Sequence, residues 1–304
     1  PIYAGALTPL WLRLLGARVG KGSEISTVLL IPSLVQVGEH SFLADDTLVG
    51  AYELGGGWIR VEHVKVGKRA FVGNSGMLAA GRKVPKQALV AVLSAAPRRK
   101  TAKAGTSWLG SPPRKLRRSE DKHDSSLTYN PSKRLLVQRG LVETGRIVPL
   151  LLALLLPVAV GVVLFALLLQ GTWGVIAALV LGGPVLLAAG VLAAGITVVA
   201  KWLIIGKHRP GEHALFTPYV WHSELADTFT EVLAAPWFAN VTSGTWALNF
   251  WLRLLGAKIG PGVWCDSYWL PETDLVTLGA GATINRGCVV QTHLFQDRVL
   301  SMDA

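Results

Sequence analysis

Aliphatic residues recur at a strict interval of six in two runs along the first third of the chain. The first run comprises Val19, Ile25, Ile31, Val37, Leu43 and Val49, and the second Val66, Val72, Leu78, Val84 and Val90. Helical faces recur at three, four and seven residues, so an interval of six argues against a helix. It is typical of a hexapeptide-repeat parallel β-helix, in which each short strand directs one aliphatic side chain into the core. The pattern predicts a first left-handed parallel β-helix over residues 1–96, with a loop leaving the coil at 51–64.

The same pattern begins again near the end of the chain. Core positions are expected at Cys265 and, after a slip of one residue, at Leu278, Ile284 and Val290. The phrase LWLRLLGARVG at 10–20 returns as FWLRLLGAKIG at 250–260, and LVQVG at 34–38 returns as LVTLG at 275–279. Each long phrase fits a short helix closed by glycine that caps the open end of a coil, with Arg13 or Arg253 on its solvated face. We therefore expect two homologous β-helix domains, the second truncated.

Two uncharged apolar runs lie between the copies, at 147–169 and 173–200. At a rise of about 1.5 Å per residue, the first reaches roughly 35 Å, enough to cross a hydrocarbon core of about 30 Å. The pattern predicts a transmembrane hairpin over 147–205, with helices at about 147–169 and 175–200. Lys and Arg residues precede it, and Lys201, Lys207 and Arg209 follow it, which places both soluble domains in the cytoplasm of a multi-pass plasma-membrane protein. Neither run contains an ionisable group, so no transport mechanism is predicted.

Residues 98–146 differ from the rest of the chain in their concentration of positive charge. The formal net charge is +11, and residues 98–146 carry 13 Lys or Arg against four acids. This basic linker, expected at 97–146, has few aromatic residues and no nucleic-acid motif, so nucleic acid is disfavoured as a partner. Residues 206–304 are expected to hold interfacial or capping helices and the start of the second β-helix. Cys265 and Cys288 are interpreted as two buried free thiols in a reducing compartment.

Candidate chemistry lies where polar groups interrupt the second coil, in GCVVQTHLFQDR at 287–298. His293 is placed there as a general base that removes a proton from an attacking amine or hydroxyl, with Gln291 and Asp297 in support. The alternative is a corner histidine whose ring is satisfied by backbone groups. The first copy has Tyr52 at the aligned position, which indicates that the first domain lacks this base. No metal-binding or cofactor-binding residues are predicted.

Other polar residues of the first copy give weaker signals. His40 and His63 do not align with His293. Asp45 and Asp46 are adjacent, so on a strand they point to opposite faces, and a joint acid–base role is not expected.

Several longer motifs resemble one family. They are WLRLLGARVGKG, GTSWLGSPP at 105–113, HALFTPYVWHSELADTF at 213–229, EVLAAPWF and NRGCVVQTHLFQDRVLSMD. Together they resemble the C-terminal membrane region of the poly-lysine-synthetase-like nonribosomal peptide synthetases. The resemblance implies tandem soluble domains separated by helix pairs, which join amino acids carried as phosphopantetheine thioesters into an isopeptide chain. It also implies adenylation and thiolation domains as partners, on the same or a neighbouring chain, and leaves a homo-oligomer open.

The resemblance makes this chain a segment of an acyltransferase or peptide synthetase that forms amide or isopeptide bonds, and only His293 is carried over onto a motif. Two other functions are also compatible with the residues. One is a non-catalytic membrane scaffold that docks partner domains, and the other is a free-standing hexapeptide acyltransferase that uses acyl-coenzyme A. The monomer and the product length are not encoded in any feature of the sequence.

Overall fold

The computed structural model describes residues 5–98, 101–117 and 124–303. They form two compact units: unit 1 comprises residues 1–133 and 295–299, and unit 2 comprises 134–294 and 300–304. Each unit is built around one copy of the repeated sequence. The two are described separately below.

Unit 1 is a coil of short parallel strands that form three sheets. The first sheet orders β1 (Arg18–Val19), β4 (Val35–Val37), β9 (Val64–Val66) and β12 (Lys83–Val84). The second orders β2 (Glu24–Ile25), β5 (Phe42–Leu43), β10 (Phe71–Val72), β13 (Leu89–Val90), β14 (Ser107–Leu109) and the antiparallel β15 (Arg114–Leu116). The third orders β3 (Val28–Leu30), β6 (Thr47–Val49) and β11 (Met77–Leu78).

The register of these strands confirms the hexapeptide pattern. Arg18 pairs with Gln36, and Phe71 pairs with Leu89, in each case 18 positions later. One coil therefore holds three hexapeptides, one for each sheet. The second run of predicted core residues is buried throughout. In the first run, the prediction that Ile31 is a core residue is wrong. Ile31 is 36% exposed, and the neighbouring Leu30 of β3 pairs with Val49 instead.

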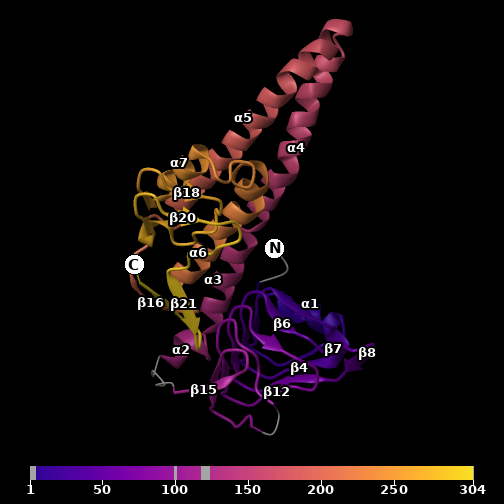
Figure 1. Cartoon of the computed structure of the whole chain (residues 1–304), viewed down its shortest axis with the longest axis vertical. Helices are drawn as coiled ribbons and strands as arrows, with labels where there is room; N and C mark the ends of the chain where they lie inside the picture. The colour runs from indigo at the N-terminus through magenta and orange to yellow at the C-terminus, as the bar shows by residue number, and fades with distance from the viewer. Residues whose placement is uncertain (1–4, 99–100, 118–123, 304) are drawn as a thin grey trace. The chain divides into compact units, whose positions relative to one another are not determined.

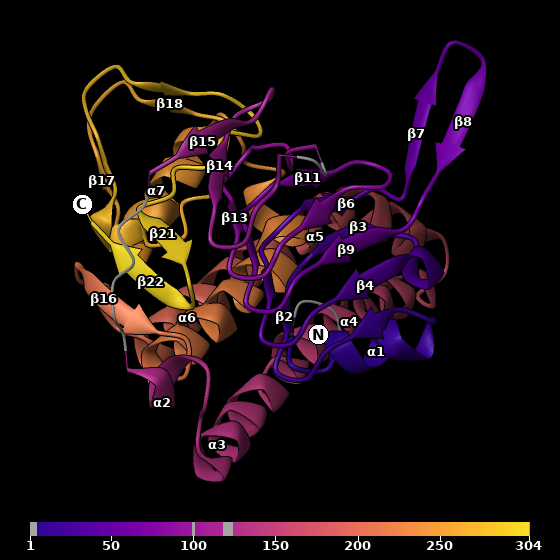
Figure 2. The same cartoon turned by 90° about the horizontal axis from the view of Figure 1, so that it is seen from below.

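A hairpin leaves this coil where the sequence predicted a loop. It consists of β7 (Tyr52–Gly55) and β8 (Trp58–Val61), paired antiparallel and projecting from the other strands of unit 1 (Figure 2). Gly56 and Gly57 connect them with φ of 47° and 83°, which fits the left-handed turn that a tight two-residue hairpin requires. The hairpin lengthens one coil, so that Val35 pairs with Val64, 29 positions later.

The coil extends beyond the predicted domain boundary at residue 96. Strand β14 pairs in parallel with β13, Leu89 opposite Ser107, and β15 folds back on β14. The start of the predicted basic linker at 97 is therefore corrected: residues 107–116 belong to the coil, because Trp108 continues the 18-residue register from Val90. Helix α2 (Ser125–Thr128) follows.

Unit 2 opens with helices. Helix α3 spans Lys133–Thr144, α4 Ile147–Leu168, α5 Thr172–Ile204, α6 Pro218–Phe229, a π-helix η2 Thr230–Ala239, and α7 Trp246–Leu255. Helices α4 and α5 are joined by a short turn, lie side by side (Figure 1), and are both long and apolar enough to cross a membrane. Most large apolar residues of α4 and of the first half of α5 are exposed. The second half of α5 packs through Ala193, Ala194 and Thr197.

The second coil repeats the first with one extra residue. It contains β17 (Lys258–Ile259), β18 (Trp264–Cys265), the 3-10 helix η3 (Thr273–Leu275), β19 (Thr277–Leu278) and β20 (Thr283–Ile284). Lys258 pairs with Thr277, 19 positions later, which confirms the predicted slip. Strands β16 (Gly211–Ala214), β22 (Val299–Met302) and β21 (His293–Gln296) form a further sheet, in that order. Cys265 is buried as predicted, but Cys288 is exposed, because the chain there has left the strands.

The repeated phrase forms the same structure in both copies. Helix α1 (Thr8–Leu14) and helix α7 are each followed by a glycine at positive φ, Gly16 at 99° and Gly256 at 120°. Arg13 donates to the carbonyl oxygens of Val19 and Gly20, and Arg253 donates to those of Ile259 and Gly260. Both arginines are exposed, as expected, but each also ties its capping helix to the first strand of a coil.

Candidate active site

His293 begins strand β21, the first strand of the hairpin that leaves the second coil. Its ring nitrogen Nδ1 lies 2.6 Å from Oε1 of Glu272, which precedes the 3-10 helix η3. The side chain of Glu272 is 2% exposed and that of His293 20%. The two residues are 21 positions apart. One turn of this coil takes 19 positions, so His293 lies about one turn after Glu272 and the coil brings the two side chains together.

Glu272 is held as a carboxylate by its partners. Burial raises the pKa of its carboxyl group, but the hydrogen bond and charge of His293, the hydrogen bond from Thr292 and the charge of His208 bring it below 4.5. The Thr292 hydroxyl donates to Glu272 Oε2 over 3.0 Å. A carboxylate that accepts from Nδ1–H fixes the imidazole with its lone pair on Nε2, the arrangement that a general base needs.

Gln291 lies at that second nitrogen. Its Nε2 is 2.6 Å from Nε2 of His293, so the amide N–H donates to the imidazole lone pair in this tautomer. Gln291 is exposed. An incoming substrate proton would take the place of this donor, and an exposed glutamine can rotate away at low cost. The structure thus brings two of the three predicted site residues together.

Asp297, the third predicted residue, lies in the turn between β21 and β22 with φ of 47°. It belongs to unit 1, whereas His293 belongs to unit 2. The carboxylate that contacts the histidine is Glu272, which the sequence analysis did not select.

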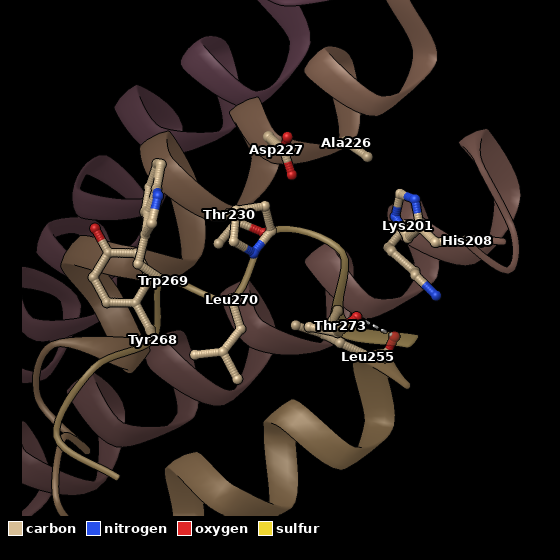
Figure 3. Close-up of a pocket in the computed structure, with 11 residues that line it drawn as sticks. Lys201, His208, Ala226, Asp227, Thr230, Leu255, Tyr268, Trp269, Leu270 and Thr273 are labelled. Carbon is tan, nitrogen blue, oxygen red and sulfur yellow. Dashed lines mark hydrogen bonds between the residues drawn. The ribbon is translucent and has the colours of Figure 1, made fainter. Parts of the chain in front are cut away.

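Unit 2 also contains a pocket, which is lined in part by the two chain neighbours of Glu272. It has an empty volume of about 480 Å³, open solvent included. Its lining, most of it labelled in Figure 3, comprises Lys201, His208, Ala226, Asp227, Thr230, Leu255, Tyr268, Trp269, Leu270, Pro271 and Thr273. Pro271 and Thr273 flank Glu272 in the chain, so the loop that carries the carboxylate also forms part of the pocket.

The polar groups at one side of the pocket are already paired. The ammonium of Lys201 lies 2.7 Å from Oδ2 of Asp274, and both side chains are buried. Asp274 also accepts from the backbone N–H of His208 over 2.9 Å. The His208 ring bonds the hydroxyl of Tyr219 at 2.8 Å. Burial lowers the pKa of His208, with the negative charge of Glu272 opposing, so this imidazole is neutral at neutral pH.

The first copy provides an internal comparison for the site. Its 3-10 helix η1 (Pro32–Leu34) corresponds to η3, and its hairpin β7–β8 corresponds to β21–β22, with a constant difference of 241 in residue number. With this offset, four positions of the first copy align with the site: Ile31 with Glu272, Gly50 with Gln291, Ala51 with Thr292 and Tyr52 with His293. All four polar residues are replaced together, while the elements that would carry them are kept. The coil therefore does not need these residues in order to fold.

The remaining predicted groups of the first copy form structural contacts. Asp45 and Asp46 lie in the turn between β5 and β6 and not on a strand, so the expectation of opposite faces is wrong. Asp45 accepts from Ser26, and Thr27 contacts both carboxylates, so the pair connects neighbouring turns of the coil. Among the residues that the structure describes, no group of three or more His, Cys, Asp or Glu residues is arranged to hold a metal ion.

Comparison with known proteins adds one sequence relative. No family model matches the chain. The chain is 37% identical over 307 aligned positions to the delta-poly-L-ornithine synthetase of Acinetobacter baumannii (strain AB307-0294), an alignment that covers 99% of this chain and 23% of that protein. This confirms the resemblance that the longer motifs indicated. The chain spans about a quarter of the length of this relative.

Similar solved structures include two acetyltransferases, one of which is named for its hexapeptide repeats. A maltose O-acetyltransferase from Clostridium difficile 630 has a TM-score of 0.31 at 14% identity, covering 38% of this chain and 76% of that chain. A hexapeptide-repeat-containing acetyltransferase from Vibrio cholerae has a TM-score of 0.28 at 17% identity, covering 38% of this chain and 81% of that chain.

Proposed function

Because nearly the whole chain aligns with a delta-poly-L-ornithine synthetase at 37% identity, we propose that this chain is part of a nonribosomal peptide synthetase, and that its unit 2 transfers aminoacyl groups from a carrier-bound thioester to an amine. The observation that carries this proposal is the buried Glu272 beside His293. This pair is present in one copy of the coil and replaced by Ile31 and Tyr52 in the other. A pair that the fold does not require is best explained by chemistry.

In the proposed step, Nε2 of His293 accepts a proton from the attacking amine as its nitrogen forms a bond to the thioester carbonyl carbon. The Glu272 carboxylate keeps Nδ1–H in place and stabilises the imidazolium that forms. The carbon–sulfur bond then breaks, and the imidazolium returns its proton to the departing thiolate. The products are an amide and a free thiol, and the histidine is restored.

The thioester is expected on a phosphopantetheine arm, and the amino acid must be activated by adenylation and thiolation domains. We propose that α4 and α5 anchor these reactions at the cytoplasmic face of the plasma membrane, as a two-helix transmembrane hairpin. The left-handed winding of both coils belongs to the same proposal.

A second function is favoured for the first copy. Its coil keeps the elements of the second copy but has Ile31, Gly50, Ala51 and Tyr52 where unit 2 has its polar site. We propose that unit 1 is a non-catalytic scaffold.

The test replaces His293 with alanine in the full-length protein and measures product release alongside amino-acid loading. Loading is expected to be unchanged and product release to fall about 10²- to 10⁴-fold, the usual contribution of a general base. Tyr52→Ala is the matched control at the equivalent position, and it should leave both rates unchanged. Full turnover by His293→Ala would exclude the catalytic role. Acyl transfer from acyl-coenzyme A without any carrier protein would favour a free-standing acyltransferase.

A further inference from the structure

The hairpin β7–β8 of the first copy corresponds strand for strand to β21–β22 of the second copy, but it lacks one neighbour. Both strands keep the offset of 241 at each end, so that Trp58–Val61 aligns with Val299–Met302. In the second copy a third strand, β16, is hydrogen-bonded to β22. Among the described residues, β7 and β8 form a sheet of two strands only, and Figure 2 shows this hairpin projecting by itself. The edge of β8 is therefore open where the edge of β22 is paired.

The same difference appears in the burial of the side chains. Leu300 and Met302 of β22 are 6% and 5% exposed, whereas Ile59 and Val61 at the aligned positions are 69% and 54% exposed. A hairpin of two strands is marginally stable in water, and an open edge is a template for pairing with a further strand. The first hairpin thus presents both an unpaired edge and exposed apolar side chains that fit one more strand.

In the second copy, one continuous segment covers β22. This segment, residues 211–229, comprises strand β16 and helix α6. The ring of His213 on β16 stacks on that of Tyr219 on α6, with 3.9 Å between the ring centroids. The Tyr219 hydroxyl in turn donates to Sδ of Met302 over 3.6 Å. The cover is therefore supplied by residues that precede the capping helix α7 in the chain.

The repeated phrase locates the equivalent segment of the first copy. Phe250 of α7 aligns with Leu10 of α1, and Gly211 lies 250 − 211 = 39 positions before Phe250. The same spacing counted back from Leu10 gives 10 − 39 = −29, a position before Pro1. The aligned synthetase extends well beyond this chain, which covers 23% of its length.

We infer that a strand followed by a helix, beginning about 30 residues before Pro1 in the same polypeptide, pairs with β8 and covers Ile59 and Val61. A second copy of this chain offers no free segment of this kind, because its own β16 is paired with β22. This surface is separate from the proposed aminoacyl transfer, so either can fail without the other.

The charges of the hairpin also favour a protein segment over a membrane surface. Arg60 is paired with Glu53 at 3.5 Å and with Glu62 at 2.6 Å. Residues 52–62 contain these three charged side chains, which leaves one net negative charge and no cation to attract anionic headgroups.

The first experiment cross-links the full-length protein in phosphatidylcholine nanodiscs. The photoreactive residue p-benzoyl-L-phenylalanine replaces Ile59, whose exposure lets the coil tolerate the change, and adducts are mapped by peptide mass spectrometry. We expect an adduct within the same molecule, on the residues that lie between the expected strand and Pro1. The same residue in place of Leu29, which is 67% exposed on β3, is the matched control and should give no adduct on that segment. Adducts on phospholipid, on a second molecule or on another part of the chain, or none at all, would overturn the inference.

The second experiment measures hydrogen exchange of the full-length protein. Ile59→Asp is expected to speed exchange at least about ten-fold both in β8 and in the upstream strand, because each loses its partner. Peptides of β9 and β10 should exchange as before, which shows that the coil remains folded. Leu29→Asp is the control and should leave the upstream strand unchanged. If Ile59→Asp also leaves it unchanged, the inference is wrong.

Discussion

At the scale of single residues, the site depends on a long-range pair that no local pattern reveals. His293 could be selected from the sequence because it stands among polar residues after the core position Val290. Glu272 could not, since it lies 21 positions earlier in PETDL, where an acid before a turn of 3-10 helix is unremarkable. The available signal was the alignment of the two copies, which places Glu272 opposite the aliphatic Ile31.

The Glu272–His293 pair predicts a specific dependence of stability on pH. The pKa of Glu272 in the folded protein is below its ordinary value of 4.5, so its ionised form stabilises the fold above that pH, and this contribution is lost as pH falls through the folded pKa. We expect Glu272→Gln to lower the unfolding free energy by roughly 1.5–3 kcal/mol at neutral pH, and by progressively less as the pH falls below the ordinary carboxyl pKa of 4.5. Thermal unfolding of both proteins as a function of pH measures the difference. A difference that grows on acidification would contradict the assignment.

At the scale of elements, the periodicity of the sequence predicted the features of the coil that depend on its repeating pattern of buried side chains. The interval of six, the slip of one residue and the capping helices all follow from which side chains a coil must bury, and the registers confirm them. Two details of the first coil were not predicted. Ile31 stands at the expected interval of six, but Leu30 occupies the paired strand position, because the chain leaves β3 and enters η1 at Ile31. Strand β14 was hidden in a basic segment, because Trp108 interrupts the aliphatic series while keeping the register.

The hairpin β7–β8 should be dispensable for the fold of unit 1. The coil that contains it spans 29 positions and an ordinary coil spans 18, so 29 − 18 = 11 residues form the excursion. Its large apolar residues are 47% to 69% exposed, so they stabilise little. We expect deletion of residues 52–62 to restore an 18-residue register and to change the melting temperature by only a few degrees. Circular dichroism would measure this, and Leu43→Ala, at a fully buried position, should lower stability by about 2–5 kcal/mol. A deletion as costly as that core substitution would contradict this account.

At the scale of the whole molecule, the two apolar helices predict which parts of the chain face each side of a membrane. Exposed leucines and valines cover α4 and the first half of α5, a surface that water disfavours and lipid does not. The chain offers a built-in reporter, because Cys288 is exposed and Cys265 is buried.

If α4 and α5 cross the plasma membrane as proposed, the turn at Gly171 lies outside and Cys288 lies inside. In intact cells, a membrane-impermeant maleimide is then expected to label Gly171→Cys and to spare Cys288, which should react only after permeabilisation. Cys265 should stay unreactive until the protein is unfolded, because its thiol is buried and donates to the carbonyl oxygen of Ser267. Labelling of Cys288 in intact cells would place the second coil outside. That result would separate it from any cytoplasmic supply of carrier-bound thioester, and the proposed aminoacyl transfer would fail with it.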